Sequence, residues 1–213
     1  MARVTKEKAA ENREALLDAA GRLFREHGID GVGVADIGKA AGLTHGALYA
    51  HFPSKEALAA EAFTRGFERS WRVLERARAK RPATFEALLA LLLSPAMRDA
   101  LAMGCPLTAS ASEVGRQGSA LSESYRNAFE QLVGLVDATL DPKLSGVERR
   151  RLALTAVAAE VGAIAVSRAL TKADGALSDE VLRAVRDTLE SAAVSGQPPV
   201  RARRRASPRS PAR

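Results

Sequence analysis

Residues 43–52 combine a slim predicted helix with polar groups at its start, a pattern that suits contact with duplex DNA. The segment reads Leu-Thr-His-Gly-Ala-Leu-Tyr-Ala-His-Phe. With Leu48 pointing inward, a helical wheel of about 100° per residue turns outward Gly46, Ala47, Tyr49 and Ala50. Apart from the tyrosine these side chains are small. With Thr44 and His45 at its N-terminus, such a helix can enter a major groove about 12 Å wide.

The residues around this segment predict two short helices joined by a tight turn. Apolar residues recur at helical intervals on both sides of Gly42, namely Val34, Ile37, Ala40, Ala41, Leu48 and Phe52. Glycine at position 42 favours a turn with positive φ, and Pro53 ends the second helix. Because the two apolar faces can share one core, the pattern indicates a helix-turn-helix.

Residues 43–58 resemble the DNA-binding head of the tetracycline-repressor (TetR) family of bacterial regulators. In that family a short recognition helix ends in Tyr-x-His/Tyr-Phe and a Ser-Lys-Glu-x-Leu segment starts the next helix. This chain has Tyr-Ala-His-Phe at 49–52 and Ser-Lys-Glu-Ala-Leu at 54–58. It departs from the family at Gly33, where Thr or Ser is usual, and at Ala35, where a basic residue is common.

The resemblance implies a homodimeric transcriptional regulator, most often a repressor, that binds a palindromic double-stranded DNA operator with one head per half-site. We expect base-edge contacts from Thr44, His45, Gly46 and Ala47. We expect phosphate contacts from Tyr49, His51, Lys55, Lys39 and the backbone near Gly33. An alternative for His51 is partial packing against the core, because it lies about 60° from Leu48 on the wheel.

The length and composition predict an all-α protein. Helix formers dominate the 213 residues, and neither alternating strand patterns nor hairpin signals occur. The predicted parts are a helix-turn-helix DNA-binding domain at 9–58, a helical effector-binding and dimerisation domain at 59–195, and a disordered Arg/Pro-rich tail at 196–213.

The net charge of +7 lies almost entirely in the tail. Residues 197–213 carry six arginines and no acid, whereas residues 1–58 hold eight Lys or Arg and eight Asp or Glu. DNA binding by the head must therefore depend on the placement of individual groups and helix N-termini rather than on bulk charge. The tail is either an electrostatic arm for DNA or a solvated extension without consequence.

Helix start and stop signals outline the remaining elements. The first helix is expected from Glu11 to His27, closed by Gly28, and the fourth from Ser54 to about Lys80. Further helices are expected at about 84–93, 96–103, 106–114, 121–140, 147–171 and 178–194. The fourth helix begins beside the recognition helix and continues into the second domain, so it is the expected mechanical link.

The last two long helices are expected to form a homodimer interface. The helix at 147–171 is lined with small and apolar residues nearly all round, and the helix at 178–194 has an apolar stripe. A four-helix interface between two copies buries both surfaces, whereas the alternative places them in a monomer core. The apolar run Leu152–Val166 is too short for a bilayer and contains Glu160, and no signal peptide is visible, so we expect a cytoplasmic protein without a membrane span.

Cys105 is the single cysteine, and its Gly-Cys-Pro context places it at or near a helix N-cap. A thiolate is favoured there by the helix dipole, so Cys105 is a candidate sensor of oxidants or electrophiles. The alternative is a small buried residue.

The resemblance also implies an effector pocket for a small apolar or electrophilic molecule. The lining candidates are Phe67, Trp71, Met103, Cys105, Tyr125, Phe129 and Glu160. An alternative for Glu160 is pairing at the dimer interface.

An enzyme is disfavoured, and we expect no catalytic residue, cofactor or metal. The three histidines, His27, His45 and His51, all lie in the predicted head, so the larger domain lacks a Cys/His pair or a His-rich metal site. The remaining alternative is a helical DNA-architectural or partner-binding protein without effector sensing.

Overall fold

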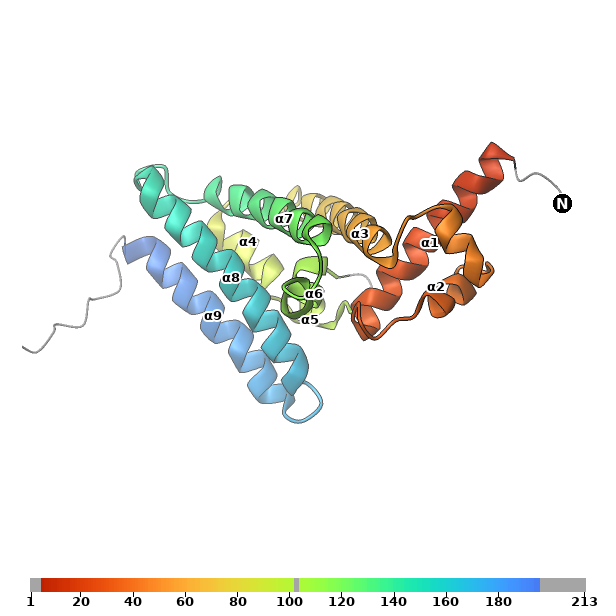
Figure 1. The fold of residues 1–213 in the computed structure, drawn as a ribbon. Helices are drawn as coiled ribbons and strands as arrows, with labels where there is room; N and C mark the ends of the chain where they lie inside the picture. Colours follow the sequence, from red (N-terminus) through yellow and green to blue (C-terminus); the bar gives the residue numbers. More distant parts are fainter. Residues whose placement is uncertain (1–4, 102–103, 196–213) are drawn as a thin grey trace, which may run out of the picture.

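The computed structural model describes residues 5–101 and 104–195, and this part of the chain is helical, as the predicted all-α class requires (Figure 1). In chain order the helices are α1 (Lys6–His27), α2 (Val34–Ala40), the 3₁₀ helix η1 (His45–Ala50), α3 (Lys55–Arg78), α4 (Phe85–Leu92), α5 (Pro95–Asp99), α6 (Pro106–Val114), α7 (Ser119–Asp137), α8 (Gly146–Leu170) and α9 (Gly175–Ser195). The predicted disordered tail lies outside the described residues.

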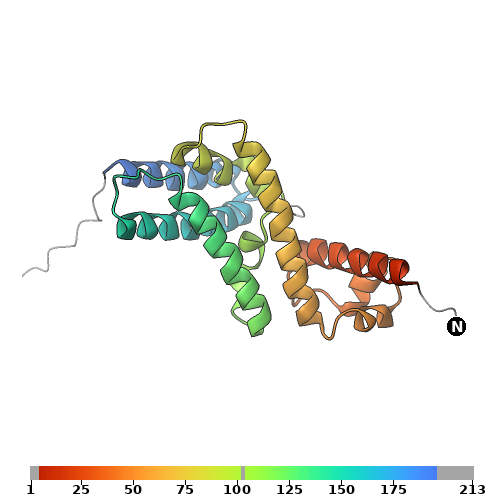
Figure 2. The ribbon, with the colours of Figure 1, turned by 90° about the horizontal axis from the view of Figure 1, so that it is seen from above.

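The head consists of α1, α2, η1 and the start of α3, grouped at one end of the molecule (Figures 1 and 2). Its core is formed by side chains that are almost fully buried, namely Leu16, Ile37, Leu48, Phe52 and Leu58. The expectation that Ala40 belongs to this core is wrong, because Ala40 is exposed at the end of α2. Helix α1 also begins earlier than Glu11, because Thr5 caps it by accepting the Lys8 N–H.

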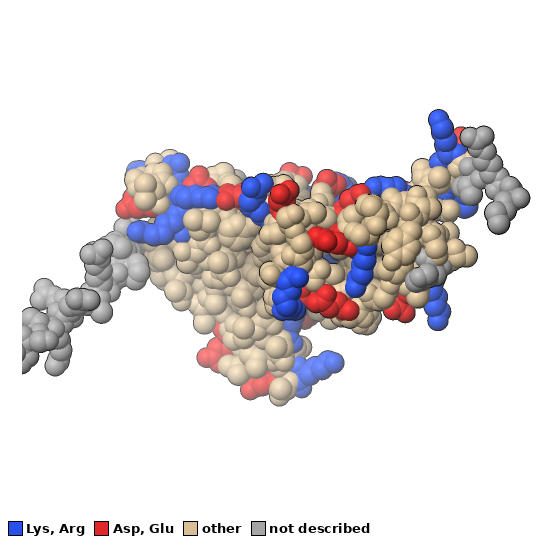
Figure 3. Space-filling model, in the orientation of Figure 1, with Lys and Arg blue, Asp and Glu red and all other residues tan. Residues whose placement is uncertain are grey.

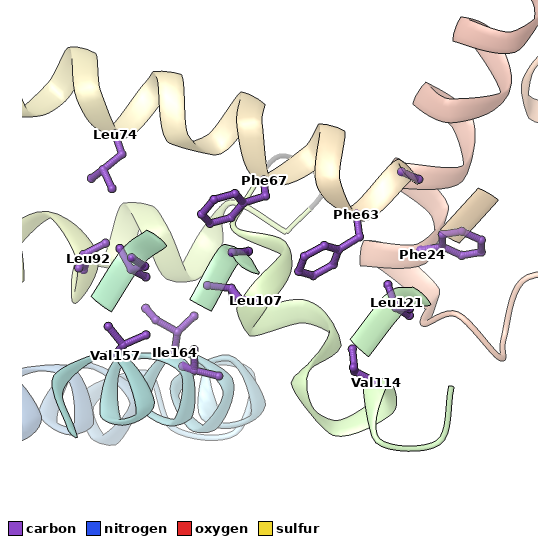
Figure 4. Close-up of a cluster of buried hydrophobic side chains, with 14 of the residues drawn as sticks. Phe24, Phe63, Phe67, Leu74, Leu92, Leu107, Val114, Leu121, Val157 and Ile164 are labelled. Carbon is purple, nitrogen blue, oxygen red and sulfur yellow. The ribbon is translucent and has the colours of Figure 1, made fainter. Parts of the chain in front are cut away.

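The body is a bundle of α4 to α9 together with the second half of α3, and α8 and α9 run side by side as an antiparallel pair (Figures 1 and 2). Its core joins side chains from α3, α4, α6, α7 and α8 (Figure 4). Among the described helices, α8 has the length and apolar composition that could cross a membrane. One face of α8 is buried and includes Val157, Val161 and Ile164. This agrees with the predicted packing of the apolar run 152–166 against other helices.

Short hydroxyl side chains begin most of the body helices. The Oγ atoms that accept an amide of the first turn belong to Ser54, Thr84, Ser94 and Ser145. The predicted bounds of these helices agree with the structure within a few residues, except at 96–103. There α5 ends at Asp99, because the Met97 and Arg98 carbonyls that a longer helix needs accept the Arg168 guanidinium instead.

A buried arginine ties α5 to the α8–α9 pair. Arg98 donates from Nη1 to Ser178 Oγ at 3.0 Å and to Asp179 Oδ1 at 2.6 Å, and from Nε to Asp99 Oδ1 at 2.7 Å. The hydrogen bonds and charges of the two carboxylates raise the pKa of Arg98 further above its ordinary range. The pairing satisfies a charge that is largely removed from water.

Two helices connect the head to the body. Helix α3 continues from one to the other (Figure 2), and a row of ion pairs attaches it to α1, namely Arg13–Glu61, Glu14–Arg65 and Asp18–Arg69. The structure confirms that this helix continues from the head into the body, as predicted, whereas sequence reasoning missed the contact through α6. At the end of α6, the Glu113 carboxylate accepts the Ile29 N–H at 3.0 and 3.2 Å, and Gln117 donates to Asp30 at 2.9 Å.

Gly28 makes the α6 contact possible and provides a test of it. It has φ +77° and ψ 163°, a conformation nearly restricted to glycine, and a Cβ there would lie 2.4 Å from Glu113 Oε1. We expect Gly28→Ala to lower the free energy of unfolding by about 2–4 kcal/mol, from backbone strain plus the lost Ile29 hydrogen bonds. Urea denaturation measures this loss.

The matched control is Gly42→Ala, at φ +70° with open space around its Cβ position. Gly42→Ala introduces backbone strain without a new contact, so we expect it to lower the free energy of unfolding by about 1–2 kcal/mol. When Glu113 is also replaced by alanine, Gly28→Ala should lower the free energy of unfolding by the backbone strain alone. An unchanged excess in that background contradicts the proposed contact.

Candidate nucleic-acid interface and ligand cavity

The recognition segment is a 3₁₀ helix and not the α-helix that the wheel assumed. The Ala47 N–H donates to the Thr44 carbonyl and the His51 N–H to the Leu48 carbonyl, each three residues back. The segment is short, and no side chain caps its start. Pro53 follows only two residues after its end. Such a short helix has too few i→i−4 bonds to hold α geometry on its own.

The tighter helix still presents the slim edge that the sequence predicted. With three residues per turn, the buried Leu48 eclipses position 51, which explains why His51 is half-buried. Gly46 and Ala50 are exposed, and Tyr49 is 56% exposed, whereas Ala47 is half-buried. Thr44 is exposed at the N-cap position in extended conformation, and His45 follows as the first residue of η1.

The close approach of α2 to this edge depends on glycine. A Cβ on Gly38 would lie 3.2 Å from the Thr44 carbonyl oxygen, and the Leu43 N–H donates to the Gly38 carbonyl at 2.8 Å. Gly42 adopts φ +70° in the turn, as the sequence predicted. The turn therefore fixes the position of η1 against α2.

The expected phosphate contacts lie around this edge. Lys39 is exposed in the last turn of α2, and Lys55 is half-buried in the first turn of α3. The Gly33 N–H already donates to Asp36 Oδ2 at 3.0 Å, so the amides that follow it at the start of α2 are the ones left for a phosphate.

Charge does not concentrate on the head. On the face that Figure 3 shows, the end of the molecule that carries α2 is largely uncharged, with isolated groups of both signs. This distribution agrees with the balanced charge of residues 1–58. Contact with DNA at this end must therefore rest on individually placed donors.

An apolar cavity of about 230 Å³ lies in the body between α3, α4, α5 and the start of α6. Its lining includes Ser70, Leu74, Leu91, Met97, Gly104 and Cys105. Of the seven lining candidates from the sequence, Cys105 borders this cavity. Most of the other lining residues were missed, because an apolar residue on a helix gives no signal that distinguishes a cavity wall from a packed core.

The other lining candidates surround the same core. Phe67 is buried, and Trp71, Tyr125 and Phe129 pack partly buried against it. The rings form two pairs, with centroids 5.8 Å apart for Phe63–Tyr125 and 5.7 Å apart for Phe67–Trp71. Met103 lies outside the described residues.

Cys105 occupies the N-cap of α6, as predicted, but its thiol is not activated there. Burial raises the pKa of Cys105 to about 12, with a further contribution from the nearby Glu160 carboxyl, and the Leu107 and Thr108 amides only partly oppose this. The expectation of a favoured thiolate is therefore wrong for this conformation, because desolvation outweighs the helix N-terminus.

Glu160 is the most buried charged residue of the body, with 1% of its surface exposed. Its Oε2 atom has no hydrogen-bond partner in the described part of the chain. Burial raises the pKa of Glu160 to about 8, and the charge of Arg168 lowers it only in part. At neutral pH the carboxyl is therefore mostly protonated.

A helix-turn-helix head on an all-helical body defines a DNA-binding class of protein, and comparison with known proteins identifies the family. The family model for bacterial regulatory proteins of the tetR family matches residues 16–62. The HTH-type transcriptional regulator AcrR of Shigella flexneri is 48% identical over 61 residues, which cover 29% of this chain and 28% of the relative. The repressor KstR2 of Rhodococcus jostii is 49% identical over 55 residues, 26% of each chain.

The likeness in structure extends over the whole body. The crystal structure of a TetR transcriptional regulator from Chloroflexus aurantiacus has a TM-score of 0.71 and 27% identity, covering 89% of this chain and 97% of that one. The curated relatives match over little more than a quarter of their own length. Residues 16–62 therefore carry the helix-turn-helix of the TetR family of transcriptional regulators, as the recognition segment predicted, and the chain as a whole has the fold of a TetR regulator.

The buried Glu160 predicts an unusual dependence of stability on pH. A carboxyl whose pKa is about 8 in the folded state and about 4.5 when unfolded stabilises the protein fully below pH 4.5, and this contribution is lost as the pH rises toward 8. Between pH 5.5 and 7.5 we expect the free energy of unfolding to fall by roughly 2 kcal/mol more in the wild type than in Glu160→Gln. Urea denaturation at both pH values measures the difference.

The comparison between the wild type and Glu160→Gln removes the contribution of every other titratable group, because those groups are common to both proteins. The exposed Glu123→Gln provides a matched control for the loss of a carboxylate and should keep the wild-type slope. Equal pH slopes in the wild type and Glu160→Gln contradict a protonated buried carboxyl.

Proposed function

We propose that this protein is a cytoplasmic transcriptional repressor that binds a palindromic operator as a homodimer and is released by a small-molecule effector. The observation that carries the proposal is the exposed, nearly bare edge of η1, held in place by Leu48 and Phe52 inside the head. The relative KstR2 is a transcriptional repressor, which supports repression as the direction of regulation. In this proposal residues 9–58 bind DNA, and residues 59–195 bind the effector and dimerise.

The proposed division of contacts follows the geometry of η1. Thr44, His45, Gly46 and Ala47 form its N-terminal part and reach base edges. Tyr49, His51, Lys39 and Lys55 flank it and hold phosphates, assisted by the first amides of α2 after Gly33. Because an edge with so little bulk brings the backbone close to the groove, even the glycine and the alanine contribute to the fit.

The proposed dimer interface is an exposed stripe of small residues on α8. The stripe follows helical spacing and consists of Thr155, Ala158, Gly162, Ala165, Val166 and Ala169. On α9, Leu177 is exposed, whereas Leu182 and Leu189 of the predicted apolar stripe are buried within the single chain, so the expectation that this stripe needs a partner copy is wrong for them. Small side chains allow two helix pairs to approach closely, and a two-fold dimer places two heads at the half-sites of a palindrome.

The proposed effector site is the cavity beside Cys105. The other expected lining residues, Phe67, Trp71, Tyr125, Phe129 and Glu160, belong to the body core and do not border this cavity. The cavity favours a sensor over a DNA-architectural protein that senses nothing. It borders α3 and the start of α6, two helices that contact the head. A ligand that displaces either helix changes the spacing of the two heads, which must lie roughly 34 Å apart on DNA.

Modification of Cys105 is the second proposed route of release. The sulfur borders the cavity, but its thiol is protonated in this conformation. An electrophile would therefore have to enter the cavity before it reacts, and the cavity would select it by shape rather than by thiolate reactivity.

Substitutions in the head test the division of contacts. Lys55→Ala should weaken binding to every DNA sequence and reduce the slope of log K against log salt by about 1, because one phosphate contact is lost. Tyr49→Phe should weaken binding uniformly with little change in slope. Thr44→Ala and His45→Ala should alter the preferred bases, at a cost of about 1–3 kcal/mol for the original site.

Selection from random duplexes and fluorescence anisotropy at several salt concentrations measure these effects. Lys172→Ala, an exposed lysine after α8, is the matched control and should leave both binding and the salt slope unchanged. Uniform weakening by all four head variants contradicts the division of contacts, and no sequence preference in the wild type contradicts the function.

A charge in the α8 stripe tests the dimer. Ala165→Arg should give a folded monomer in sedimentation velocity and abolish operator binding, because two guanidinium groups meet across the two-fold axis. Ala120→Arg, an equally exposed alanine on α7, is the control and should remain dimeric. A dimer that survives Ala165→Arg places the interface elsewhere.

A further inference from the structure

The basic side chains of α3 differ in their pairing along the helix. Near the head, Arg65 and Arg69 are paired with the Glu14 and Asp18 carboxylates of α1. Beyond them, five exposed or half-buried basic residues have no ion-pair partner in the part of the chain that the structure describes. These five form the basic end of α3 and are Arg72, Arg76, Arg78, Lys80 and Arg81. Their charge is therefore available to a partner outside the chain.

Positive charge in this protein is concentrated in two segments. Residues 72–81 hold five Lys or Arg and the single acid Glu75, which gives a net charge of +4. Residues 197–213 add six arginines and no acid. Together the two segments exceed the net charge of +7 of the whole chain, so all other residues taken together are net acidic.

Helix stability does not account for the basic end of α3. Basic residues are common in the last turn of a helix, where they interact with the helix dipole, and Arg76 and Arg78 lie in that turn. Arg72 lies a turn earlier, and Lys80 and Arg81 lie beyond the last helical residue. A surface segment of this composition is instead typical of contact with a polyanion.

Both basic segments lie away from the head. Helix α3 begins next to η1, and its 24 residues, at about 1.5 Å each, separate its two ends by about 36 Å. Figure 2 shows α3 running away from the head and α9 ending on the side of the body opposite the head. Arg201 follows six residues after Ser195, and six residues span at most about 20 Å. A straight duplex held along η1 therefore lies a full helix length from the basic end of α3.

The spacing of the basic end of α3 suits a nucleic-acid backbone. Arg72 and Arg76 are four residues apart, which places them on one ridge of the helix about 6 Å apart along its axis. Phosphates of one DNA strand follow every 3.4 Å or so, so the interval is close to that of every second phosphate, roughly 7 Å. Guanidinium groups also donate pairs of parallel hydrogen bonds to phosphates.

The position of the protein on DNA favours a duplex as the partner. A protein that its head holds on DNA has other stretches of the same DNA at high local concentration. A second contact with DNA therefore gains from the first, whereas a contact with an acidic protein or a membrane does not.

We propose that the basic end of α3 and the arginines of residues 197–213 bind a second DNA duplex while the head holds its operator. The contacts are ion pairs and hydrogen bonds to phosphates, which carry no sequence information. One protein then bridges two stretches of DNA. The second site goes beyond the proposed function, because it needs neither an effector nor a preferred DNA sequence.

Capture of a second duplex tests the proposal. An operator duplex is immobilised and saturated with the full chain, and a fluorescent duplex of unrelated sequence is then added. Fluorescence anisotropy of the unrelated duplex alone, at several salt concentrations, gives its affinity and salt slope. The variants are Arg72→Ala/Arg76→Ala and Arg204→Ala/Arg205→Ala. The matched control is Arg126→Ala/Lys172→Ala, which removes two exposed charges elsewhere on the body.

The wild type and the control should capture the unrelated duplex. Arg72→Ala/Arg76→Ala should lower its affinity about tenfold at 0.1 M salt and reduce the slope of log K against log salt by about 2, because two phosphate contacts are lost. Arg204→Ala/Arg205→Ala should have a similar effect. All variants should keep the operator affinity of the wild type, which also shows that they fold.

The proposal is overturned if the wild type captures no second duplex, or if Arg72→Ala/Arg76→Ala captures it as well as the wild type does. An equal loss in the control variant also overturns it, because bulk charge then explains the binding. Vesicles of anionic phospholipid replace the duplex in a parallel experiment, and binding of vesicles without capture of DNA identifies a membrane instead. The anisotropy titration contains no operator, so it still tests the second site if the head proves to have no preferred sequence.

Discussion

The burial of Leu48 and Phe52 is the constraint on which the DNA-binding surface depends. A helix as short as η1 cannot persist by its own hydrogen bonds, so these two side chains hold it against Ile37. The Arg13 guanidinium lies 4.7 Å from the Phe52 ring centroid and covers its outer side. With the large side chains fixed inward, glycine and alanine remain outward, and the backbone of η1 is left accessible on its outer side.

A small number of contacts through α3 and α6 joins the head to the body. The cavity is bordered by Ser70 and Leu74 of α3 and by Cys105 at the start of α6. Helix α3 runs into the head along a row of ion pairs, and α6 ends at the carboxylate that accepts the Ile29 amide. A displacement at the cavity can therefore reach the head by two routes with different chemistry, one exposed to salt screening and one partly buried.

The sequence predicts the parts of this structure that depend on local chemistry. Ser54 as a cap, Gly42 with positive φ and the bounds of α6 follow from residues next to one another in the chain. The 3₁₀ form of η1, the Glu113 contact and the cavity lining depend on groups distant in sequence. The Cys105 thiol shows why: its position at a helix N-terminus is local, but the burial that controls its pKa comes from packed neighbours.

The head and the body differ in how completely their buried polar groups are paired, and Glu160 is the main example in the body. In the head and at its junction, charged groups are paired across helices and the Gly33 and Ile29 amides have carboxylate partners. In the body core the Glu160 Oε2 atom has no hydrogen-bond partner within the described residues, and it stands between Val157 and Ile164, where an apolar residue would be more stable. The body therefore carries a desolvation cost at Glu160 that the paired groups of the head do not carry, because a buried oxygen without a partner loses its hydration and gains no hydrogen bond in return.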